Sequence, residues 1–280
     1  MDIEDLLNDY AAGVRNFQES NFSGFALGGQ TLRNVDLRRV DLSGADLVGA
    51  DLSYANLREA NLSGADLREA NLTGTNLIGA NLQEAVLGKA ILVEAGLRGA
   101  RLQSANLQQA NLTEVNLAEA LLNHADLTEA TLVDANLSRT KIMGANLTRA
   151  NLENANLVNA ILTGAILEAA NLTSANLMGA TLEEADLREA DLSRAKLVGA
   201  ILTHANLSQV SGRGANLNWA SLRSANLYKA NLYRARLNWA NLSEANLNET
   251  VLISARMEQV NLYKANLLGA MMPDGGQFEG

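Results

Sequence analysis

Two histidines are the side chains in this sequence best suited to bind a metal ion or transfer a proton. His124 and His204 occupy the same position of a repeated pentad, and sixteen pentads separate them. If the chain stacks as β-structure with four pentads to a layer, four layers of about 4.8 Å each would separate them by about 19 Å. Two residues that far apart cannot share a metal ion, so we expect surface histidines and no metal site.

Other residues that could support catalysis are not expected to lie in a cleft. Adjacent carboxylates such as Glu183 and Glu184 are frequent, yet general acid and base catalysis needs a cleft, which a convex repeat shaft does not offer. No phosphate-binding glycine loop or serine nucleophile elbow is present, and the NLS and NLT tripeptides are by-products of the repeat. We expect no catalytic residues, no cofactor and no enzyme activity.

The charge and cysteine content narrow the function further. The chain has a net charge of −9 with acidic and basic side chains spread along it, which argues against binding to nucleic acid or anionic lipid. The absence of cysteine excludes disulfides and thiolate chemistry. The start of the sequence has no basic, apolar export signal, and no window approaches 18 consecutive apolar residues, so we expect a cytoplasmic protein without a membrane association.

These side chains belong to a pentad repeat without insertions, so the fold of the repeat determines where they lie. From Phe17 to Met272 every fifth residue is Leu or a substitute for it, which gives 52 consecutive pentads. Two residues before each Leu stands Ala from Ala45 onward, with a few Thr and Val replacements. An unbroken period of this kind indicates one repeat domain.

The period is incompatible with an α-helix and fits extended chain. Five helical residues rotate by about 140°, which would smear the leucines around the helix. In an extended segment, residues two apart point to the same side, so Ala and Leu face inward and the Asp or Asn between them faces outward. The next two residues are left to turn a corner, and repetition closes a polygonal coil with a leucine-lined interior.

The number of pentads in one coil follows from the spacing of unusual residues at the outward position before Leu. Residues other than Asp or Asn recur there at every fourth pentad; they are Arg101, Leu121, Lys141, Ile161, Thr181, Ile201 and Ser221. The other such positions between Val86 and Ser211 depart from Asp or Asn only seven times. Trp219 and Trp239 are also four pentads apart. We therefore predict four pentads per coil and about 13 coils.

The run from Ala45 to Leu67, ADLSGADLVGADLSYANLREANL, resembles the pentapeptide-repeat family, and the resemblance covers about nine-tenths of the chain. It implies an all-β fold, the right-handed quadrilateral β-helix, which agrees with the coil of four pentads. The segments LLNDYAAGVRNFQESNF and AMMPDGGQF are similar to a cyanobacterial subgroup that includes a regulator of heterocyst differentiation. Membership fixes the shape of the chain and leaves its role open.

Both ends of the repeat show signs of capping. Ile3, Leu6, Leu7 and Tyr10 have the spacing of an amphipathic helix, which Asp2 caps and Gly13 ends. We expect residues 1–14 to form a capping helix, 15–272 the solenoid and 273–280 a tail, in which Pro273 ends the sheet and Phe278 folds back. The alternative at the far end is a homodimer through the end of the solenoid.

One pentad lacks its central side chain. It runs from Val210 to Gly214 and has Gly212 in place of Leu. We expect a void there, partly filled by Val210, and a local bulge.

An exposed apolar surface is the best functional clue. On a coil of four pentads, two lines of apolar or weakly polar side chains meet at one corner, and two tryptophans continue that corner. Contiguous apolar patches with a charged rim are typical of interaction sites. Dimerisation through this surface and neutral drift of its residues are the alternatives. The predicted partner-binding residues are Val158, Ile161, Met178, Thr181, Val198, Ile201, Trp219 and Trp239, which we call the apolar strip, together with Leu121, Lys141 and Arg101, with Arg139 and Lys196 as further rim residues.

The sequence thus predicts a protein-interaction scaffold, with regulation as one role open to it, whose protein partner it does not identify. The alternative is a DNA mimic that inhibits an enzyme such as gyrase, or a purely structural protein. Duplex DNA carries one charge per about 1.7 Å, whereas nine charges over 13 coils of about 4.8 Å give one per about 7 Å. The imitation of DNA would therefore be poor.

Overall fold

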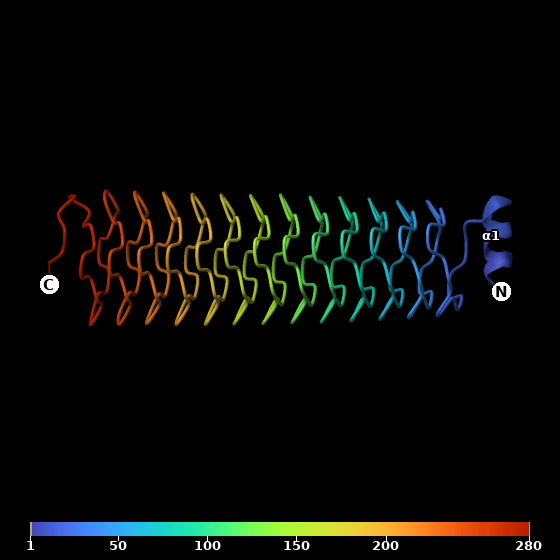
Figure 1. The fold of residues 1–280 in the computed structure, drawn as a ribbon, viewed down its shortest axis with the longest axis horizontal. Coiled ribbons are helices and arrows are strands. Elements are labelled where there is room, and N and C mark those ends of the chain that lie inside the picture. Colours follow the sequence, from blue (N-terminus) through green and yellow to red (C-terminus); the bar gives the residue numbers. More distant parts are fainter. Residues whose placement is uncertain (1, 280) are drawn as a thin grey trace. The chain divides into compact units, whose positions relative to one another are not determined.

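The computed structural model describes residues 2–279, which fall into two compact units that divide between residues 140 and 141. Each unit is a stack of β-coils in which single extended residues form parallel bridges to residues four pentads away (Figure 1). Asp41 pairs with Asn61 in the first unit, and Ile161 pairs with Thr181 in the second. Four pentads therefore complete one coil, as the outward departures predicted.

The interior is lined by the repeated Leu and Ala, because these side chains alternate with outward Asp or Asn along each extended segment. Leu62, Ala65 and Leu67 are fully buried, and the same holds for almost every equivalent position. The two phenylalanines that replace leucine at the start of the repeat, Phe17 and Phe22, are also buried. This core of small side chains depends on close stacking between coils.

Backbone hydrogen bonds join each coil to the next and to the preceding one. The Leu42 N–H donates to the Asn61 carbonyl at 2.7 Å, and the Asp41 N–H donates to the Ser20 carbonyl at 3.0 Å. The bridged residues stand singly, so the main chain is paired at one short stretch on every side of the coil. Each side therefore holds its outward side chains in fixed lines parallel to the axis of the stack.

The corners have a backbone conformation that the sequence analysis did not anticipate. The second residue after each Leu has a positive φ, for example 62° at Gly44 and 58° at Glu59, and the Ala45 N–H donates to the Leu42 carbonyl at 3.1 Å. A positive φ at the third position is the mark of a type II turn, which favours glycine. Most corners nevertheless have other residues, so the stack imposes this conformation on them.

Asp or Asn before Leu also contributes to the corner. Asp41 Oδ1 accepts from the Ser43 backbone N–H at 3.0 Å and from Asn61 Nδ2 at 3.0 Å, and Asn81 Nδ2 donates to Asn61 Oδ1 at 3.0 Å. The side chain thus fixes its own turn and links neighbouring coils. This double role accounts for the preference for Asp and Asn at the outward position.

Helix α1 (Ile3–Ala11) lies at the start of the first unit (Figure 1). The predicted cap is confirmed, because the Asp5 N–H donates to Asp2 Oδ1 at 2.9 Å and the Asp2 N–H donates to Asp5 Oδ2 at 3.2 Å. Leu6 is buried, and the Tyr10 hydroxyl donates to the Arg33 carbonyl at 3.2 Å, so the helix packs against the first coils. Within the described residues, no helix has the length and apolar character needed to cross a membrane.

At the end of the second unit the chain reverses. Met271 pairs in parallel with Val251 and in antiparallel with Gln277, and the Phe278 N–H donates to the Ala270 carbonyl at 2.8 Å. The predicted return of the tail after Pro273 is therefore confirmed for the backbone. Phe278 itself is 39% exposed, so the chain covers this residue only in part.

The bulge predicted at Gly212 is wrong. The Gly212 N–H donates to the Asn231 carbonyl at 2.8 Å, and Ser211 pairs with both Asp191 and Asn231, as in a regular coil. The space left by the missing side chain is entered by Leu232, whose Cδ2 would lie 2.7 Å from a Cβ added at Gly212. A neighbouring leucine thus fills the gap and leaves the backbone regular.

Candidate functional site

The first line of the apolar strip lies on one side of the second unit. Ile161, Thr181 and Ile201 are joined by consecutive parallel bridges. Ile201 is 42% exposed and the other two are half-buried. These positions replace the usual outward Asp or Asn, so apolar atoms face solvent where most equivalent positions have amides or carboxylates.

The second line lies on the preceding side of the same coils. The Asn159 N–H donates to the Met178 carbonyl and the Gly179 N–H donates to the Val198 carbonyl, each at 3.0 Å, which places Val158, Met178 and Val198 on successive coils. Met178 is 42% exposed, and the two valines are half-buried. The structure thus brings the six predicted aliphatic and threonine positions together as two neighbouring lines.

Between the two lines is the corner that carries the tryptophans. Gly179 and Gly199 occupy it on two coils, and Trp219 and Trp239 occupy it on the next two, all with positive φ. The indole rings are stacked with centroids 5.1 Å apart and planes 4° apart, and they are 61% and 50% exposed. Two large aromatic side chains with so much exposed surface are a typical anchor for a partner.

The predicted rim residues divide between the units. Arg101 and Leu121 lie in the first unit and are bridged to each other, and Arg139 lies in the same unit. Lys141 lies in the second unit, bridged to Ile161, and Lys196 is bridged to Asn176 and Asn216. Lys141 and Lys196 are therefore the rim residues that the structure brings to the apolar strip.

A group of cations beside the tryptophans was missed by the sequence analysis. Residues 191–240, which we call the basic segment, contain seven Lys and Arg and one acidic residue, Asp191. Its net charge is thus +6, while the chain as a whole has −9. A running count of charge along the sequence would have found it, because the average over the chain hides it.

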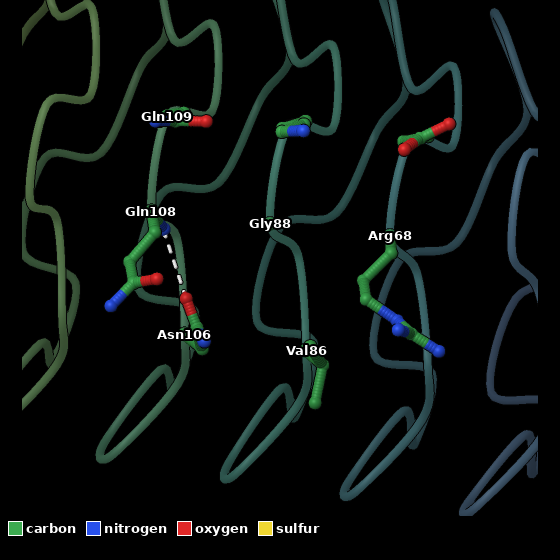
Figure 2. A pocket seen from close by; sticks show the side chains of 8 residues that line it. Arg68, Val86, Gly88, Asn106, Gln108 and Gln109 are labelled. Atoms are coloured by element: carbon green, nitrogen blue, oxygen red, sulfur yellow. Dashed lines mark hydrogen bonds between the residues drawn. The ribbon is translucent and has the colours of Figure 1, made fainter.

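The first unit contains an open depression beside Gly88. It has a volume of about 270 Å³, and its lining includes Arg68, Lys89, Asn106 and Gln108 (Figure 2). The glycine leaves room between the longer side chains of Arg68 and Gln108 on either side of it. The Arg68 guanidinium forms an ion pair with Asp66, with Nη2 and Oδ2 2.6 Å apart. The lining of the depression is polar, and none of its described residues is a nucleophile placed beside a base.

The pKa shifts of the acidic residues come from hydrogen bonds that hold the fold together. The hydrogen bond from the Arg38 side chain lowers the pKa of Asp36 below its ordinary value, and that from Arg68 lowers the pKa of Asp66 in the same way. Among residues 2–279, no group of His, Asp and Glu is placed to hold a metal ion.

A family model described as pentapeptide repeats matches the chain in overlapping stretches that run from residue 16 to residue 269. No curated protein sequence matches it.

Among solved structures, the crystal structure of HetL, a pentapeptide repeat protein involved in heterocyst differentiation regulation from the cyanobacterium Nostoc sp. strain PCC 7120, is 35% identical. That match covers 99% of this chain and 100% of HetL, with a TM-score of 0.53. Rfr23 from the cyanobacterium Cyanothece 51142 is 29% identical over 45% of this chain and 86% of its own, with a TM-score of 0.33. QnrB1, a plasmid-mediated fluoroquinolone resistance protein, is 20% identical over 74% of this chain and 89% of its own, with a TM-score of 0.29.

Proposed function

The chain belongs to the pentapeptide-repeat family, and from that premise we propose that it is a non-catalytic protein-interaction scaffold with a regulatory role. It binds a protein partner through the apolar strip. The observation that carries the proposal is the continuity of the strip, in which two lines of apolar side chains flank a corner that leads to the stacked pair Trp219 and Trp239.

The rigidity of the coils favours binding at this surface. Backbone hydrogen bonds hold each strip residue on its coil, for example from the Ile201 N–H to the Ala180 carbonyl at 2.9 Å. A partner therefore meets a preformed surface and loses little of its binding free energy to ordering this chain. Met178, Ile201 and the tryptophans are the most exposed strip residues and the expected anchors.

The regulatory part of the proposal is supported by HetL, which is described as involved in heterocyst differentiation regulation and matches nearly the whole chain at 35% identity. The finer features of the fold belong to the same proposal. They are a right-handed quadrilateral β-helix of about 13 coils, with a capping helix in residues 1–14, the solenoid in 15–272 and a tail in 273–280. We place the protein in the cytoplasm, without a cofactor, and leave a homodimer through one end of the solenoid as the alternative use of that end.

The alternative role as a DNA mimic is disfavoured by charge. A mimic needs a continuous acidic face, and the basic segment interrupts the acidic surface with seven cations against one carboxylate. A purely structural role gives no reason for the exposed stacked tryptophans.

The test is a pull-down from the source cell in which the partner is identified by mass spectrometry with the unaltered chain as bait. Ile161→Asp combined with Ile201→Asp should abolish its capture, because two charges then stand within the apolar surface. Ile91→Asp combined with Ile166→Asp is the matched control, since both residues occupy the same pentad position on other sides and are exposed. Equal capture by the strip variant and the unaltered chain would refute the proposal.

A further inference from the structure

Six of the seven cations of the basic segment lack carboxylate partners within the described residues, in contrast with many arginines elsewhere. Arg39 pairs with Glu19 at 2.7 Å, and Lys229, the seventh cation of the segment, pairs with Glu249 at 3.5 Å. Within residues 2–279, six cations of the segment form no ion pair; they are Arg194, Lys196, Arg213, Arg223, Arg234 and Arg236. Exposed charges of one sign on neighbouring coils repel one another, and a bound anion relieves that repulsion.

The coil places these cations on both sides of the tryptophan corner. Lys196 and Arg236 belong to one bridged line on the side that ends at the corner, with Asn216 between them. Arg223 follows the corner on the next side. Successive coils are about 4.8 Å apart, so Lys196 and Arg236 are separated by about 10 Å along their line.

A second cluster stands one corner earlier. The Tyr233 ring has the Arg213 guanidinium 5.3 Å and the Arg234 guanidinium 4.9 Å from its centroid. The uncharged ring attracts both guanidiniums, so two positive charges stay close together and neither is neutralised. The arrangement presents two guanidiniums to any carboxylate that approaches this corner.

The stacked tryptophans leave a place for a third ring. Trp239 covers one face of Trp219, and on the opposite side the corner continues as Gly199, where an added Cβ would meet no atom within 4 Å. Val198 and Ile201 flank this glycine in the chain. A flat ring that enters above Gly199 would extend the column and contact aliphatic side chains at its edges.

From these features we infer that the partner presents an acidic protein segment that carries an aromatic side chain. The ring stacks on Trp219 above Gly199, and the flanking carboxylates pair with the free cations of the basic segment. This inference rests on the proposed function and names the chemistry of the partner at the end of the apolar strip that carries the tryptophans.

A protein segment fits the surface better than a single-stranded nucleic acid does. Within the second unit, the residues outside the basic segment have a net charge of −6, which disfavours an extended polyanion that runs beyond the patch. Val198, Ile201 and Met178 offer aliphatic contacts that suit apolar side chains. A short acidic segment needs only the cations that are present.

The inference can be tested with a labelled synthetic peptide that has one Phe between runs of Asp and Glu, measured by fluorescence anisotropy on the full chain. We expect saturable binding that weakens with added salt, and weaker binding of the same peptide with Ala in place of Phe. Trp219 and Trp239 are the two tryptophans of the sequence, so the intrinsic emission should change on addition of an unlabelled copy of the peptide. Lys196→Glu combined with Arg236→Glu should raise the Kd by about tenfold or more, because attraction becomes repulsion.

Arg58→Glu combined with Lys89→Glu makes the same change in net charge within the first unit and should leave the Kd unchanged. Absence of saturable binding, equal binding of a Gln and Asn version of the peptide, or tighter binding of an oligothymidylate of equal charge would each overturn the inference.

The two proposals can fail separately. If the captured partner is lost with the Ile161 and Ile201 variant and kept with the Lys196 and Arg236 variant, this inference is wrong and the proposed function stands. If the peptide binds as expected while capture survives the strip variant, the proposed function of the strip is wrong instead.

Discussion

Leu232 occupies the space that Gly212 leaves open, since a Cβ at position 212 would lie 2.7 Å from Leu232 Cδ2. The contact is with the end of a side chain that can return to the arrangement of the other leucines. Gly212→Leu should therefore complete the leucine line and raise the free energy of unfolding by about 1 kcal/mol, through added burial and a less flexible unfolded chain. Chemical denaturation measures the change.

The control for this experiment is Leu192→Ala in the same line. It removes a buried side chain with no replacement and should lower the free energy of unfolding by about 2 to 5 kcal/mol. A loss of stability in Gly212→Leu would mean that Leu232 cannot move aside.

The corner conformation predicts that two glycines respond differently to substitution by Ala; Gly99 is exposed and Gly88 is half-buried. Gly99 has a φ of +66° and open space around it, so Gly99→Ala should cost about 1 kcal/mol through backbone strain alone. Gly88 stands one residue earlier in its pentad, outside the positive φ position, and Gly88→Ala should be neutral or stabilise by a few tenths of a kcal/mol. Thermal unfolding distinguishes them, and equal effects would contradict the role of φ.

Acid should weaken the first unit through its paired aspartates. Because the hydrogen bond from Arg68 lowers the pKa of Asp66 in the folded chain, the ionised form is favoured by folding. The stability it contributes is complete above the ordinary Asp pKa of about 4 and is lost as the pH falls through the lowered folded value. Asp66→Asn should flatten this part of the stability profile, measured by denaturation at successive pH values.

Helix α1 should stabilise the first coils. Leu6 is the buried residue of the helix, and Leu6→Ala should lower the free energy of unfolding by about 2 kcal/mol or more. Amide exchange of Phe17 and Phe22 should then accelerate, whereas Leu7→Ala at a half-buried position should have a smaller effect. Unchanged exchange in the Leu6 variant would show that the helix does not protect the coils.

The sequence predicted the core and the coil length because both follow from strict periods. Ala and Leu recur at fixed spacing, and the departures from Ile161 to Ser221 repeat at every fourth pentad, so the inward and outward faces needed no other information. The corner conformation was missed because residues as different as Glu59, Trp219 and Gly44 share the same positive φ. There the stack determines the backbone and the residue type does not report it.

The sequence predicted only part of the candidate site, because only part of it follows from the period of the repeat. The register of Trp219 and Trp239 follows from their separation, but the parallel stacking of their rings depends on side-chain packing that a period does not encode. The filling of the gap at Gly212 depends likewise on a neighbour in the next coil, Leu232. The basic segment was readable from the sequence and was hidden by averaging charge over the whole chain.

Because equivalent positions four pentads apart are paired, only insertions of certain lengths leave the surface of such a protein unchanged. Within the second unit, duplication of a block of four pentads would add one layer and return every later side chain to its original wall, as the bridge from Ile161 to Thr181 requires. Loss or gain of one pentad would instead turn all later walls by a quarter of a circuit, and Trp239 would part from Trp219 if the change fell between them. Indels in multiples of four pentads are therefore the ones that keep a surface intact while the molecule grows.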